Sequence, residues 1–235
     1  GECYYNNLET LKIMETDNCY GGIATGGYTE DSNIILIEDS NYLGHELMHV
    51  AQYDRINKKS SIEFGEGMFD RGIIEGVTEY LTMKAYGLSR PDSYSFEVFC
   101  VSMLDSGSVS ELFRPFFIPS HEEFIKLFSK ERDIYSLMYS LNFYFENMLD
   151  YKESIINQED IMLDMLLVKE SIRDTIDSLI TIELSLESDP RKLQIYSEKF
   201  MDLISSRDVC DDLKIFDPKY KDYAQKEIKK RIRKK

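Results

Sequence analysis

The sequence His45-Glu-Leu-Met-His49 constrains this chain more than any other feature, because it places two histidines four residues apart. Apolar residues recur at helical spacing from residue 43 to about residue 54, which predicts a helix there. Residues four apart lie one turn apart on the same face of a helix, so both imidazoles can reach one ion. Glu46 can then reach a water molecule held by that ion. The pattern predicts a metal centre with two nitrogen ligands of the kind that zinc prefers.

A third ligand is available in the stretch IIEGVTEYLT at residues 73–82. Catalytic zinc typically has three protein ligands. Glu75 and Glu79 are four apart on one face of a second predicted helix, and Gly76 should let the two helices approach closely. We expect Glu75 to reach the metal. Glu79 would accept a hydrogen bond from the far nitrogen of a zinc-bound histidine, as outer carboxylates do in such sites.

The alternative is an ordinary surface helix with solvated histidines and glutamates, because a bare H-E-x-x-H also arises by chance. Two of the only three histidines in the chain stand at ligand spacing, which favours a site. Glu75 also lies among apolar neighbours, which is unusual for an ordinary surface acid.

H-E-x-x-H on one helix, followed by E-G-x-x-E on the next, resembles the gluzincin group of zinc metallopeptidases, which includes the thermolysin-like enzymes. The resemblance implies one Zn²⁺ per chain, held by His45, His49 and Glu75. It implies that Glu46 is the general base for a zinc-activated water that hydrolyses a peptide bond without a covalent intermediate. Glu79 would support a ligand histidine, although the group more often has Asp there.

The resemblance covers residue 43 to about residue 87, and outside this window no family is recognised. The metzincin pattern is excluded, because it needs Gly and His where this chain has Gln52 and Arg55. By resemblance to such peptidases, the chain is expected to be secreted or on the cell surface.

Sites of this type usually contain a donor that stabilises the oxyanion, often a histidine or a tyrosine. His121, the remaining histidine, is one candidate, although a helix cap or a surface histidine is the simpler interpretation. The competing tyrosines, each of which could equally be an aromatic core residue, are Tyr80, Tyr86, Tyr135, Tyr139 and Tyr144. An extended peptide substrate would pair with an exposed strand edge, for which residues 33–38 and 21–29 are the candidates.

The predicted fold class is α+β and zincin-like, with residues 1–58 forming a small β-containing lobe that includes the active-site helix. Residues 59–235 form a helical lobe that carries the third ligand, and both lobes belong to one compact catalytic unit. Residues 33–38 are typical of a strand, 21–29 of a strand or loop, and 8–14 of a strand or a helix. A helix cap is expected at Ser40 or Asn41. Further helices are predicted near 93–105, 121–131, 133–151, 158–187, 190–205 and 219–232.

The net charge of −15 argues against a nucleic-acid partner, so a peptide or protein substrate is expected. The basic run KKRIRKK at residues 229–235 is either a solvated terminal helix or a basic collar beside a membrane anchor. No stretch reaches the ~18 apolar residues of a membrane span. The four cysteines, among which a Cys3–Cys19 disulfide would suit a secreted protein, are Cys3, Cys19, Cys100 and Cys210.

Three hypotheses remain open on sequence alone. The leading one is a zinc metalloendopeptidase of gluzincin type. The second is a catalytically inactive zinc-binding protein whose helical lobe binds a partner, which the intact Glu46 disfavours. The third is a helical interaction domain without a metal.

Overall fold

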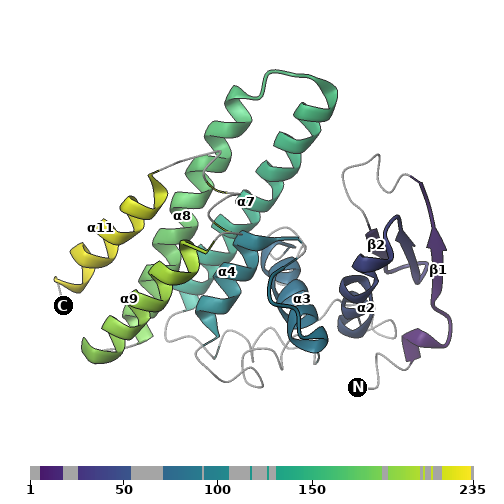
Figure 1. Ribbon diagram of the computed structural model, residues 1–235, viewed down its shortest axis with the longest axis horizontal. Helices are drawn as coiled ribbons and strands as arrows, with labels where there is room; N and C mark the ends of the chain where they lie inside the picture. Colours follow the sequence, from purple (N-terminus) through teal and green to yellow (C-terminus); the bar gives the residue numbers. More distant parts are fainter. Residues whose placement is uncertain are drawn as a thin grey trace.

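The computed structural model describes residues 6–17, 26–53, 71–91, 93–105, 117, 126, 131–186, 190–206, 209, 213 and 219–233. In this part of the chain the fold is mostly helical with one small three-stranded sheet, in agreement with the predicted α+β class. Figure 1 shows the sheet and helix α2 at one end of the molecule, α3 next to them, and the longer helices beyond α3.

The sheet has the strand order β1-β3-β2. Its strands are β1 (Lys12–Glu15), β2 (Gly26–Thr29) and β3 (Ile34–Ile37). β3 pairs in parallel with β1 and antiparallel with β2, so the strand predicted at 33–38 is confirmed but lies in the centre. It therefore cannot offer a free edge to a substrate. The neighbouring strand predicted within 21–29 is confirmed for residues 26–29, and the remainder lies outside the described residues.

Helix α2 (Leu43–Gln52) is packed against the sheet through a small apolar cluster in which Ile35, Ile37 and Val50 are buried. The predicted cap at Ser40 or Asn41 is wrong. A single 3-10 turn (Ser40–Tyr42) precedes α2, and Asp39 caps that turn by accepting the N–H of Asn41 at 2.9 Å. The N-cap residue of α2 itself is Tyr42, which makes no side-chain cap hydrogen bond.

Asn7 ties the other end of α2 to the N-terminal segment. Its Nδ2 donates to the carbonyl oxygens of Val50 and Tyr53, at 2.7 and 2.8 Å. Both carbonyls lie at the C-terminus of the helix, where capping by a side chain is common. Asn33 in turn donates to the Asn7 carbonyl at 2.7 Å. The sheet and α2 are thus joined by buried hydrogen bonds as well as by apolar packing.

Helix α3 (Arg71–Tyr86) is followed directly by Gly87, whose φ of +68° lies in the left-handed region that commonly terminates helices. It packs on α4 (Ser95–Leu104) at Gly76, where a Cβ would lie 2.9 Å from the backbone of Glu97. The prediction that Gly76 lets α2 approach is therefore wrong. At the α2 side the close contact is made by Gly44 on α2, where a Cβ would lie 2.7 Å from the ring of Tyr86.

The remaining described helices enclose the large hydrophobic core together with α3 and α4. They are α7 (Glu131–Asn157), α8 (Met162–Leu186), α9 (Pro190–Ile204) and α11 (Tyr220–Ile232). These helices and α4 confirm the segments predicted near 93–105, 133–151, 158–187, 190–205 and 219–232. The segment near 121–131 lies almost entirely outside the described residues.

The basic C-terminal run begins inside α11, whose Ile228 is buried in the core. Arg231 forms an ion pair with Asp177 at 3.0 Å, and Lys230 forms one with Glu227 at 3.1 Å. This part of the run belongs to a packed helix. Of the helices in the described ranges, none is both long and apolar enough to cross a membrane.

Candidate metal centre

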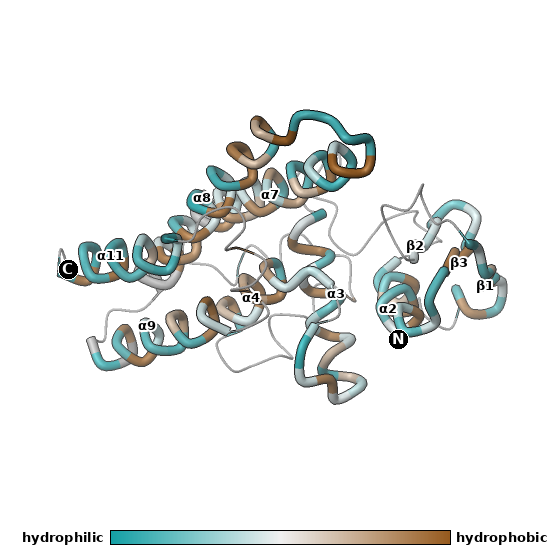
Figure 2. Tube along the Cα trace, turned by 45° about the horizontal axis from the view of Figure 1, so that its top comes forward, coloured by the Kyte–Doolittle hydropathy of each residue, from teal (hydrophilic) through white to brown (hydrophobic). Residues whose placement is uncertain are grey.

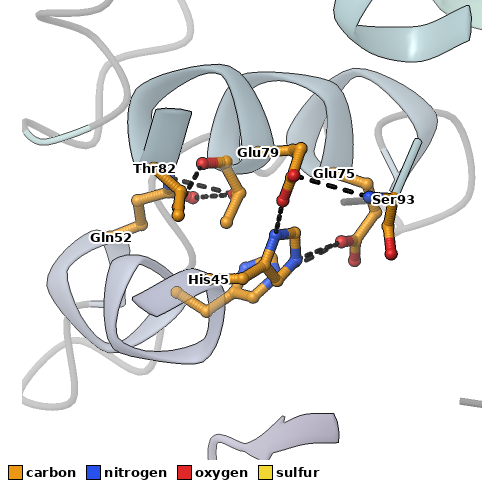
Figure 3. A network of polar contacts seen from close by, with 8 residues as sticks. His45, Gln52, Glu75, Glu79, Thr82 and Ser93 are labelled. Atoms are coloured by element: carbon orange, nitrogen blue, oxygen red, sulfur yellow. Dashed lines mark hydrogen bonds and ion pairs between the residues drawn. The ribbon is translucent and has the colours of Figure 1, made fainter. Parts of the chain in front are cut away.

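Helices α2 and α3 position the four side chains singled out from the sequence. His45 and His49 lie one turn apart on α2, and Glu75 and Glu79 lie one turn apart on α3. Gln52 and Thr78 join the two helices by a buried hydrogen bond of 3.1 Å. Figure 3 shows both carboxylates of α3 directed towards the imidazole of His45.

Three atoms meet between the helices. Nε2 of His45 lies 3.0 Å from Oε2 of Glu75 and 3.1 Å from Nε2 of His49. Nε2 of His49 lies 3.3 Å from the same Glu75 oxygen. Two ligand atoms of a tetrahedral ion with bonds of about 2.0–2.1 Å lie about 3.3 Å apart. The triangle therefore has the size that such an ion requires, and these residues form a group that could hold a metal ion.

Glu79 determines which nitrogen of His45 faces this triangle. Its Oε2 lies 2.9 Å from Nδ1 of His45, and an ionised carboxylate can only accept, so Nδ1 donates. Neutral His45 then keeps its lone pair on Nε2. That lone pair faces Nε2 of His49 and an oxygen of Glu75. The three atoms therefore need a hydrogen between them, carried by one of the histidines, or a metal ion in its place.

The charges of the site express the same requirement. Burial lowers the pKa of His45, but hydrogen bonds to Glu75 and Glu79 and the nearby negative charges outweigh it and raise that pKa to about 10. Burial raises the pKa of Glu75, yet the charge of His49 and the hydrogen bonds from both histidines bring it below its ordinary value. In the metal-free protein a proton therefore occupies this group, and a metal ion would have to replace it.

Glu46 is 5% exposed and lies beside this group without belonging to it. The backbone N–H of Tyr28 on β2 donates to its carboxylate. The carboxylate also lies against Gly26, where a Cβ would come within 3.0 Å of Oε1. Burial raises the pKa of Glu46, and the charges of His49 and His45 partly oppose this rise. Strand β2 thus holds the carboxyl group within electrostatic range of the histidines.

Tyr94, which the sequence reasoning missed, forms a further wall of the site. Its ring stacks on His45 with centroids 5.4 Å apart, and its backbone has a φ of +56° in the left-handed region. The adjacent Ser93 N–H donates to Oε1 of Glu79 at 3.5 Å. Burial, followed by the charge of Glu75, raises the pKa of the Tyr94 hydroxyl, which stays protonated. The one available signal was its position in the short connection that follows the glutamate-bearing helix.

The structure places the proposed oxyanion donors as follows. The Tyr80 hydroxyl donates to Asp105 at 2.7 Å, and the ring of Tyr144 is buried in the large core. Tyr86, Tyr135 and Tyr139 are exposed on α3 and α7. His121 lies outside the described residues, as do Cys3, Cys19 and Cys210, while Cys100 is a buried free thiol.

Comparison of the chain with protein-family models, with curated proteins and with solved structures found no match. What the site can do therefore has to be judged from its own residues. Two imidazoles and a carboxylate that converge on one point, with a second carboxylate fixing a tautomer, form a group able to hold a metal ion.

Proposed function

We propose that this chain is a zinc-dependent metallopeptidase of gluzincin type, with a zincin-like arrangement of its small sheet, site helix and helical lobe. The observation that carries the proposal is the meeting of the His45, His49 and Glu75 ligand atoms at 3.0 to 3.3 Å. The Glu79 hydrogen bond to the opposite nitrogen of His45 supports it, because this carboxylate–histidine arrangement orients imidazole ligands of metals.

The donor set favours zinc with a catalytic role. Imidazole nitrogens with one carboxylate oxygen suit Zn²⁺, and a structural zinc site would usually have four protein ligands. Among the described residues, no fourth His, Cys, Asp or Glu joins the group. Three protein ligands leave one coordination position for water or substrate. Zinc in such a site polarises a carbonyl and acidifies water.

The chain's own residues supply the proton transfer. The Glu46 carboxylate takes the proton from the attacking water and delivers it to the leaving amine, as a general base and then a general acid. Its position supports this role, since Tyr28 and Gly26 hold it beside the histidines and away from the ligand triangle. His45 and His49 would hold the metal ion through Nε2, and Glu75 through Oε2, the three atoms that converge between the helices.

An extended substrate would bind along β2. Among the described residues this strand is paired on one side only, and it lies against α2 next to Glu46. β3, the other candidate from the sequence, is excluded by its central position. Peptide added to an edge strand gains affinity from main-chain hydrogen bonds, and pockets for alternate side chains of the substrate would determine specificity.

The test combines metal analysis with a peptide-library cleavage assay on the native chain and on Glu46→Gln. We expect one zinc per chain in both proteins, and a loss of cleavage by about 10²–10⁴-fold in the variant. Cleavage that survives Glu46→Gln would exclude the mechanism. Zinc without turnover on any peptide would favour the inactive zinc-binding protein, and absence of zinc would favour the helical interaction domain.

A further inference from the structure

The antiparallel pair α7–α8 ends in a tip that stands clear of the other elements (Figure 1). We call residues 150–167 the hairpin tip. Six of its apolar side chains are between 38% and 76% exposed, namely Ile155, Ile156, Met162, Leu163, Leu166 and Leu167. In Figure 2 the brown of hydrophobic residues is visible at the end of α7 and at the start of α8. Clustered exposed apolar residues of this kind usually mark an interaction site.

The first turns of α8 are built as a contact face. Met162 with Leu166, and Leu163 with Leu167, lie one turn apart and form a continuous apolar strip on the surface. From residue 162 to residue 167 no apolar side chain of α8 is fully buried, and burial begins at Val168. The packing of α8 against α7 therefore does not account for these leucines.

The rim of the hairpin tip is acidic. It carries five acidic residues and one lysine, a net charge of −4: Asp150, Glu153, Glu159, Asp160 and Asp164, with Lys152. Asp160 also caps α8 by accepting the Met162 N–H at 3.0 Å. An acidic rim around an apolar strip attracts a partner with the opposite charge pattern.

Neither a second copy of this chain nor an anionic membrane suits the acidic hairpin tip. Two tips placed against each other would bring like charges together. The basic helix α11 of a second copy is not available, because its own apolar residues Tyr220 and Ile228 are buried in the core. An anionic bilayer would repel the rim in the same way.

We propose that the hairpin tip is a docking surface for a basic amphipathic helical segment of a partner polypeptide. Leucine-like side chains of the segment lie on the strip of Leu163 and Leu166, and its lysines and arginines lie against Glu153 and Glu159. Recognition of an amphipathic helix by an apolar surface with charged borders is a common mode of peptide binding. The proposal is independent of the metal centre, and its test does not require a bound metal.

The test uses the full chain and a fluorescent peptide of leucine and lysine, about 14 residues or about four helical turns, with leucine at helical spacing. Two peptides of the same length serve as controls, one with leucine and lysine alternating at strand period, the other with glutamate in place of lysine. We expect saturable binding of the first peptide, weakened by added salt. Equal binding of the glutamate peptide, or no saturable binding of the first, would overturn the proposal.

Variants locate the binding. Leu163→Ser with Leu166→Ser should weaken the Kd by about tenfold or more, since central apolar contacts dominate such interfaces. Glu153→Gln with Glu159→Gln should weaken it less and reduce the salt dependence. The matched control is Ile195→Ser on α9, also a strongly exposed residue at 64%, which should leave the Kd unchanged. Circular dichroism should show native helix content and melting in all of these variants, because every substituted side chain is exposed.

An unchanged Kd in the leucine double variant would place the peptide elsewhere and refute the docking surface. Concentration-dependent self-association that the leucine substitutions abolish would assign the strip to a second copy instead. Binding to phosphatidylcholine vesicles, lost in the same variant, would assign it to a membrane surface. Either result would overturn the proposed partner.

Discussion

Glu79 offers the sharpest test of the metal centre, because the gluzincin resemblance favours the shorter Asp at this position and the structure favours Glu. Gluzincins more often have Asp at the corresponding position. Here Oε2 of Glu79 reaches Nδ1 of His45 at 2.9 Å. Shortening the side chain by one methylene moves the oxygen back by about 1.5 Å, to about 4.4 Å, which is beyond hydrogen-bonding range. Glu79→Asp should therefore weaken the site here, although Asp is the commoner residue in that group.

The expected size follows from the bond that is lost. A hydrogen bond to a charged group contributes about 1.5–3 kcal/mol, which corresponds to about 10–150-fold in a binding constant. Loss of such an outer partner typically reduces metal affinity about 10–100-fold. Glu79→Gln keeps the length and an acceptor oxygen but removes the charge, so it should have the smaller effect of the two.

Zinc affinity would be measured by competition with a chromogenic chelator, at constant pH. Glu146→Gln is the control, since Glu146 is an exposed glutamate that pairs with Arg71 at 3.3 Å on the surface, and it should not change the affinity. Circular dichroism in the presence of chelator should show that the metal-free variants keep their helices. A Glu79→Asp protein that binds zinc as tightly as the native chain would refute the assigned role of the Glu79 hydrogen bond.

Two glycines give further predictions. Gly76→Ala places a Cβ 2.9 Å from the backbone of Glu97, so it should lower the free energy of unfolding by about 1–3 kcal/mol, measured by urea denaturation; an unchanged midpoint would contradict the close α3–α4 contact. Gly26→Ala places a Cβ 3.0 Å from Oε1 of Glu46, so peptide cleavage should fall about tenfold or more while the zinc content stays at the native level. Loss of zinc in Gly26→Ala would instead mean that β2 supports the ligands.

The local parts of the site were predictable because helical periodicity alone determines them. Four-residue spacing places His45 over His49, and Glu75 over Glu79, whatever the rest of the chain does. The extent of α2 followed from its apolar spacing, which predicted a helix from residue 43 to about residue 54, and the helix spans Leu43–Gln52. Each helix could therefore be read separately from its own sequence.

The parts that failed depend on which element lies next to which. Gly76 was assigned to α2 instead of α4. A glycine in a helix indicates that another element packs closely there, but it does not identify that element. The central position of β3 depends on the order of the strands in the sheet, which the sequence of one strand does not determine. Tyr94 stacks on His45 from the connection between α3 and α4, where its backbone adopts the left-handed conformation at a φ of +56°. A non-glycine residue in that region is uncommon, and no pattern in the sequence marks it.

The two four-residue spacings act together through a single ring, and this makes the combined pattern more selective than either half. His45 uses both of its nitrogens, Nδ1 towards Glu79 and Nε2 towards Glu75, at 2.9 and 3.0 Å. One turn of α3 separates the two carboxylates, and residues at this spacing have Cβ atoms about 5–6 Å apart, which suits two side chains that bracket an imidazole. A chain with H-E-x-x-H alone leaves Nδ1 without a fixed partner and its tautomer undetermined. The second pair of residues, E-x-x-x-E on a helix packed against the first, is therefore what turns a chance spacing of histidines into a specific physical hypothesis.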